Sequence, residues 1–443
     1  MLAFGSLASA EDMITSSGRL ELRGVDALHR DSVDEGPGLS GRIKIDTLNT
    51  GWNIHSWIEG GWDGAVKRPA RDKALFKNYD QVYQSNTPYI GFKELYLSHV
   101  GNDLDLRAGI QRFAWGRLDE VPSNDLLNPW DYNQYLTKSL EDRKIGVPSL
   151  SANKSIGDLS YDAVWVPWLI PYRLPLPDER WSGTSSASAL AQIPNASITP
   201  TEPDLPPRTF RNGNFGVRIK NSGALEWALN LYHGFDPKPV FRATSLVINP
   251  QPNGIAIDPG YVPDFHRITS VGIDAAIVRG DWSIRSEAAY IMNRYYNIKR
   301  ELWGYPSAPA TGLYGLNPIE WKTDVLDYGI GADRRLFEDG TLTIQAEQTV
   351  ILGDVEMLHE KKFETILWAH LKAGWLNQKI ETNLSVAYNP EHGAGLTKAD
   401  AWWVFTDHFK TGITMIAFHG PSQSVFGRYS RNDQVEAELV YSW

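Results

Sequence analysis

The last nine residues of the chain constrain its fold most, because apolar and polar side chains alternate along them. The apolar positions are Val435, Ala437, Leu439, Tyr441 and Trp443, and the polar ones between them include Glu436, Glu438 and Ser442. Successive side chains of a strand point to opposite faces, so the segment predicts a β-strand with one apolar face and one polar face. A strand that meets lipid on one face and ends on an aromatic residue is typical of the closing strand of a transmembrane barrel. For this segment alone, an edge strand of a soluble β-sandwich is the alternative.

The same alternation recurs along the whole chain, for example at residues 104–111, 342–350 and 380–388. The polar faces carry charges of both signs, which suits a hydrated lumen better than a packed core, because charges are almost never fully buried without partners. We predict about 18 strands, although a count of about 16 also satisfies the even number expected of a bacterial barrel. The predicted strands are residues 17–27, 39–48, 52–61, 88–100, 103–112, 144–154, 158–167, 212–221, 224–234, 266–278, 282–293, 322–336, 341–351, 363–375, 379–388, 398–406, 411–420 and 432–443.

Short and long connections alternate between these strands. The short turns, such as Arg279-Gly280-Asp281 and Glu338-Asp339-Gly340, carry the Gly, Asn and Asp residues that tight hairpins require. The long connections lie near residues 62–86, 113–143, 168–211, 236–265 and 294–321. This layout predicts an all-β fold: a closed antiparallel transmembrane β-barrel with short periplasmic turns and long extracellular loops.

The composition agrees with such a barrel and excludes several other classes of protein. No stretch approaches the roughly 18 consecutive apolar residues of a membrane-spanning helix. The chain contains 17 Trp and 19 Tyr, residues favoured at membrane interfaces. Its net charge of -10 argues against nucleic acid as a partner, and the absence of cysteine excludes disulfides.

The N-terminal residues indicate export. Residues 1–10 are apolar and small and end in Ala8-Ser9-Ala10, which fits a signal-peptide cleavage site, although the basic start of a complete signal is missing. We therefore expect a partial signal peptide at 1–10 and a single barrel at 11–443. The expected location is the outer membrane of a Gram-negative bacterium, with outer-membrane lipid and the barrel assembly machinery as partners. Leu439, Tyr441 and Trp443 are the candidate residues for barrel closure and recognition during assembly.

The connection at residues 113–143 is the candidate functional segment, because it combines aromatic residues, both charge signs and helix-start signals. Asn128-Pro129 before Trp130-Asp131 predicts a short helix that extends to about residue 144. We expect this loop to fold inward and narrow the lumen, with Arg112, Arg117 and Arg143 facing acidic residues across it. The candidate constriction residues are Arg112, Trp115, Gly116, Arg117, Asp119, Glu120, Asn128, Trp130 and Asp131. Alternatively, Trp115 and Trp130 pin the loop to the barrel wall.

Part of this region resembles a known family. The turn Phe113-Ala114-Trp115-Gly116, then Asn128-Pro129-Trp130-Asp131, and the stretch Trp165-Val166-Pro167-Trp168 resemble a largely uncharacterised family of proteobacterial outer-membrane β-barrels. That family is similar in plan to alginate-export-type barrels and substrate-specific porins. The resemblance covers residues 105–180 best and implies a membrane conduit.

The expected function is therefore a porin-like channel that passes a small or medium solute, selected by the loop 113–143. One alternative is a conduit for lipids or hydrophobic compounds that works with a periplasmic or inner-membrane exporter, and another is a plugged scaffold. The ten histidines make no zinc-ligand spacing, and nucleophile-elbow, P-loop and dinucleotide-binding motifs are absent. We expect neither an enzyme nor a cofactor or metal.

Overall fold

The computed structural model describes residues 13–28, 36–48, 51–63, 89–120, 122–132, 136–174, 181, 196–198, 204–252, 254–258, 260–299, 302 and 312–443. The partial signal peptide predicted at residues 1–10 lies outside the described residues.

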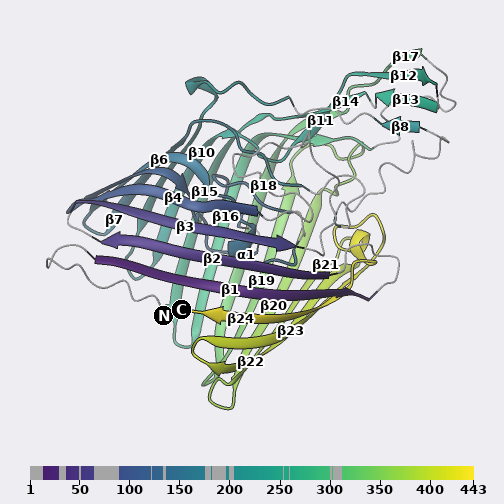
Figure 1. Ribbon diagram of the computed structural model, residues 1–443. Helices are drawn as coiled ribbons and strands as arrows, with labels where there is room; N and C mark the ends of the chain where they lie inside the picture. The colour runs from purple at the N-terminus through teal and green to yellow at the C-terminus, as the bar shows by residue number, and fades with distance from the viewer. Residues whose placement is uncertain are drawn as a thin grey trace.

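Eighteen antiparallel strands form one closed barrel, as the sequence predicted (Figure 1). The barrel strands of the first half are β1 (Met13–Ala27), β2 (Gly36–Leu48), β3 (Trp52–Asp63), β4 (Tyr89–Val100), β5 (Leu104–Gln111), β6 (Val147–Ile156), β7 (Leu159–Val166), β9 (Asn214–Asn221) and β10 (Glu226–Phe235). Those of the second half are β15 (Arg267–Arg279), β16 (Trp282–Asn297), β18 (Glu320–Phe337), β19 (Gly340–Ile351), β20 (Phe363–Trp375), β21 (Ile380–Asn389), β22 (Ala394–Thr406), β23 (Phe409–His419) and β24 (Gln434–Ser442). Each pairs with the next barrel strand along the chain, and each contains most of one predicted segment.

The barrel closes where β24 pairs with β1, from Arg19 opposite Ser442 to Ala27 opposite Gln434. One residue beyond this ladder, the backbone groups of Gly18 and Trp443 exchange two hydrogen bonds of 3.1 Å. The Trp443 ring lies over Gly18, where a side-chain Cβ would overlap the ring. The last residue is therefore tied to the sheet by both its backbone and its side chain.

The two faces of the barrel differ as the alternation predicted. On β15, Val271 and Ile273 point outward and are 52% and 49% exposed, whereas Asp274 points inward and is 1% exposed. Outward side chains of other strands are also large, apolar and exposed, including Leu20, Leu229, Ile330, Ile344, Leu384, Ile413 and Leu439. The polar and charged residues that alternate with them line the inside.

The connections segregate by length. The turns at one end, such as those at residues 280–281 and 338–339, are short, and the connections at the other end include those at residues 112–146 and 236–266. The long connections also contain strands that the sequence did not reveal: a four-stranded sheet of β8 (Ala196–Ile198), β12 (Ser245–Gln251), β13 (Gly254–Asp258) and β17 (Gly312–Gly315), and a pair of β11 (Val240–Ala243) and β14 (Tyr261–Asp264). Figure 1 places both at the long-loop end.

The helix predicted from Pro129 is wrong. The backbone N–H of Asp131 donates to the Arg143 carbonyl (2.6 Å), and the N–H of Tyr132 donates to the Arg173 carbonyl (2.8 Å), so extended pairing occupies these groups. The single turn of helix α1 (Leu140–Arg143) begins later, after Ser139, whose hydroxyl accepts from the N–H of Asp142. Among the described residues, no helix has the length and apolar character needed to cross a membrane.

Trp443 should be required for efficient closure of the barrel, because it is the last rung between β24 and β1. We expect Trp443→Asn to lower the fraction of protein that runs as a folded, heat-modifiable barrel in semi-native electrophoresis of membranes. The matched control is Trp403→Asn, which removes an outward-facing tryptophan from β22, away from the closing pair. Equal folded fractions for the two variants would contradict the role of Trp443.

Candidate functional site

The connection between β5 and β6 enters the barrel, and Asn128 holds its two ends together. This side chain is fully buried. Its Oδ1 accepts from the N–H of Phe113 (2.7 Å), and its Nδ2 donates to the carbonyls of Gln111 (3.1 Å) and Ile145 (2.8 Å). One amide therefore joins the residue that leaves β5 to the residue that approaches β6.

Beyond this junction, a turn formed by residues 116–120 and 122–124, here called the docking turn, lies against the inner wall. Arg117 donates from Nε to Asp274 (2.7 Å) and from a terminal nitrogen to Glu226 (2.7 Å). Asp119 accepts from Arg285 (2.9 Å). The wall partners belong to β10, β15 and β16, so this part of the loop is braced by one side of the barrel.

Inward-facing glycines of the wall make room for the loop. A Cβ on Gly329 would lie 2.5 Å from a methyl carbon of Leu118, and one on Gly216 would lie 2.7 Å from the Trp115 ring. A Cβ on Gly272 would overlap the side chain of Asn124. The small residues of the wall are therefore filled by the loop instead of leaving open space.

A second part of the loop, residues 136–142, crosses the lumen to the opposite side and is here called the crossing segment. Lys398 of β22 donates to the carbonyl of Thr137 (2.8 Å). At the other end, Asp142 of α1 lies 3.0 Å from Arg42 of β2 and 3.2 Å from Lys93 of β4. Burial raises the pKa of Asp142, but the charges of Lys93 and Arg42 outweigh it and hold this pKa below its usual range. The crossing segment is thus held by charged groups at both ends.

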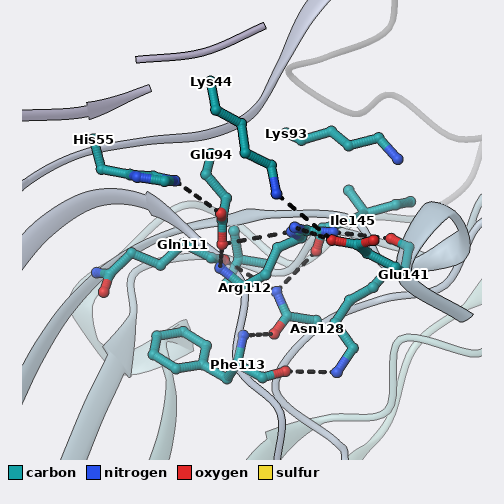
Figure 2. A network of polar contacts seen from close by, with 12 residues as sticks. Lys44, His55, Lys93, Glu94, Gln111, Arg112, Phe113, Asn128, Glu141 and Ile145 are labelled. Atoms are coloured by element: carbon teal, nitrogen blue, oxygen red, sulfur yellow. Dashed lines mark hydrogen bonds and ion pairs between the residues drawn. The ribbon is translucent and has the colours of Figure 1, made fainter. Parts of the chain in front are cut away.

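Figure 2 shows how the wall next to α1 is organised around charge. Arg112 donates to the carbonyl of Glu141 (2.9 Å) and lies 3.5 Å from Glu94. On its other side, Glu94 lies 3.1 Å from the Nε2 atom of His55. The guanidinium of Arg112 also lies 4.1 Å from the centre of the buried Trp57 ring, a cation–π contact. These contacts connect α1 to strands β3, β4 and β5.

Between the crossing segment and the wall lies a cavity of about 290 Å³. The crossing segment forms one side of it, and strands β22–β24 and β1–β4 form the other. The lining residues are Arg19, Glu21, Arg23, Gly38, Leu39, Ser40, Arg42, Glu59, Trp62, Lys93, Thr137, Lys138, Ser139, Glu141, Asp142, Lys398, Asp400, Trp402, Thr414, Glu436 and Glu438. Thirteen of these 21 residues are charged, with both signs represented, so the cavity is a hydrated passage and not an apolar one.

The candidate residues from the sequence lie beside this cavity and do not line it. Their charges do not face one another across the lumen but are paired locally. Arg143 donates to Glu120 (2.6 Å), and Asp131 accepts from Arg173 (2.8 Å). Trp115 and Trp130 are both buried, Trp115 in an apolar cluster with Leu126 and Leu127, and Trp130 beneath Arg143 and Lys144. This arrangement matches the alternative that the two tryptophans pin the loop.

Sequence reasoning missed most residues that line the cavity. The signal was present for Glu436 and Glu438, which belong to the polar face of the final strand. It did not show that they share one space with Arg19, Arg42 or Lys398, because those residues come from strands that are distant in sequence.

One grouping among the described residues has the composition of a metal site. Potential ligand atoms of Asp264, His266 and Glu320 lie within 4.8 Å of one another at the long-loop end. Both oxygens of Asp264 already accept hydrogen bonds, from Arg242 and from the N–H of Phe265. His266 is bonded to Glu320 at 2.8 Å, so the protein satisfies these groups without an ion.

Comparison with known proteins supports the fold. No family model matches the sequence, and no curated protein does. Among solved structures, OccAB4 of Acinetobacter baumannii superposes with a TM-score of 0.51 at 10% identity, over 98% of both chains. OccAB1 of the same organism gives 0.50 at 6% identity, over 98% of this chain and 96% of that one. At the level of fold, the predicted resemblance to substrate-specific porins is confirmed.

Proposed function

We propose that this protein is an outer-membrane channel through which a small or medium polar solute diffuses. The observation that carries the proposal is the charged cavity between the crossing segment and the wall of β22–β24 and β1–β4. A lipid conduit would need an apolar track, and a charged lining disfavours one because burying unpaired charge against hydrocarbon is costly.

The outer surface supports the membrane location. A soluble barrel would not expose so many large apolar side chains on consecutive strands, because exposed apolar patches of this extent mark contact with a partner or a membrane. Closure by β24 and β1 leaves no unpaired edge, as a strand-built membrane protein requires. The short turns then face the periplasm and the long connections face the outside.

Selection of the solute would take place at the crossing segment. It divides the lumen, and the docking turn and the apolar cluster around Trp115 fill the space on the side of β9–β19. A solute that enters from the long-loop end would pass between α1 and the opposite wall. There Arg19 and Arg23 of β1 face the same space as Glu436 and Glu438 of β24. Charges of both signs around a narrow opening orient polar solutes and determine ion preference.

The charges of the lining should set the ion selectivity of the channel. We expect single openings of the purified protein in a planar bilayer. The double variant Glu436→Gln/Glu438→Gln should shift the reversal potential toward anion preference, because it removes negative charge from the opening. Arg19→Gln/Arg23→Gln, the matched control of opposite sign, should shift it toward cation preference. A folded wild-type protein that never conducts would refute the proposed channel.

The loop should limit the size of the passage. Deletion of residues 116–130 removes the docking turn and the packing on the side of β9–β19, so single-channel conductance should rise above that of the wild type. Heat-modifiable migration of the variant serves as the control for a folded barrel. If a folded variant keeps the wild-type conductance, the loop does not constrict the lumen.

A further inference from the structure

We propose that Glu287, on the inner wall of β16, is the residue that positions the loop across the lumen. This inference rests on the proposed function for its consequence, because a displaced loop would change the passage. The sequence places Glu287 in a strand with no motif, and it was not among the candidate residues.

The carboxylate of Glu287 binds the backbone of the docking turn. Its Oε2 accepts from the N–H groups of Arg117 (2.6 Å) and Leu118 (3.4 Å), and its Oε1 accepts from the N–H of Ser123. Successive N–H groups that converge on one anion form a backbone nest. Among the described residues, all three donors to this buried carboxylate are backbone groups, so Glu287 recognises the shape of the turn and not one side chain.

The turn is shaped for this carboxylate. Gly116 has a φ of +95°, in the region that favours glycine. A Cβ at this position would lie 2.5 Å from Oε2 of Glu287 and 3.0 Å from Cβ of Pro122. Glycine is therefore required here by the backbone conformation and by the approach of Glu287, which explains the Trp-Gly-Arg sequence at residues 115–117.

Glu287 also occupies the middle of the surface on which the loop lies. Strand register places it opposite Asp274 on β15 and opposite Gly329 on β18, with Glu347 opposite Gly329 on β19. Asp274 binds the side chain of Arg117, and Gly329 leaves room for Leu118. Of these neighbouring groups, Glu287 is the one that binds the turn through its backbone at three points.

The positioning role can be tested by two measurements on the full chain in lipid nanodiscs or bilayers. Glu287→Ala should make the amides of residues 117, 118 and 123 exchange with deuterium faster than in the wild type, because they lose their acceptor. It should also replace the wild-type conductance level by larger and noisier openings. Glu287→Gln, which keeps one acceptor oxygen, should give an intermediate result.

Glu347→Gln is the matched control. Glu347 is also a buried carboxylate of the inner wall, and its hydrogen bond comes from Gln345 of the same strand. This variant should keep the exchange rates and conductance of the wild type. If Glu347→Gln and Glu287→Ala give the same change, or if Glu287→Ala changes neither quantity, the proposal is overturned.

A double-mutant cycle separates positioning from general destabilisation. Gly116→Ala should accelerate amide exchange of the turn more in the wild-type background than in the Glu287→Ala background, because only the former contains the opposing carboxylate. Strictly additive effects would contradict the direct coupling. The exchange measurements remain decisive even if the wild-type protein does not conduct, so the proposed channel and the role of Glu287 fail separately.

Discussion

The pairing of β1 with β24 is the interaction on which the other features depend, because it turns a sheet into a barrel and so creates an inside. In hydrocarbon every backbone polar group needs a partner within the protein, and closure supplies one along both terminal strands. Once an inside exists, the alternation of each strand acquires a meaning. The same period of two that exposes Leu439 and Tyr441 outward points Glu436 and Glu438 into the lumen.

Charges inside the barrel are then arranged in two different ways. On the side of β10–β19, Arg117, Asp119 and Asp274 are paired at hydrogen-bond distances and help to hold the loop. Paired and hydrogen-bonded charges can be buried at tolerable cost, whereas removing one partner leaves the other uncompensated. Around the cavity the charged residues line a hydrated space. The protein therefore uses one chemistry for support on one side of the lumen and for passage on the other.

The sequence predicted the barrel well because its signals are local. Alternation and turn residues identify each strand, and all 18 predicted strands occur. The helix expected at Pro129 failed because the N–H groups of Asp131 and Tyr132 bond to residues that are close only in the folded chain. The cavity was missed for a similar reason, since Arg42 and Lys398 meet only through the closed topology. Local patterns carry no information about such contacts.

The division of the lumen follows from where the wall is small. Gly216, Gly272 and Gly329 lie on strands β9, β15 and β18, and each accommodates a loop side chain that a larger residue would exclude. The wall of the passage instead presents long charged side chains such as Arg19, Arg42 and Lys398. A loop that enters from β5 therefore fits closely against the first wall and is kept away from much of the second. The position of the opening is thus encoded by the distribution of glycine and long side chains around the barrel, and not by the loop alone.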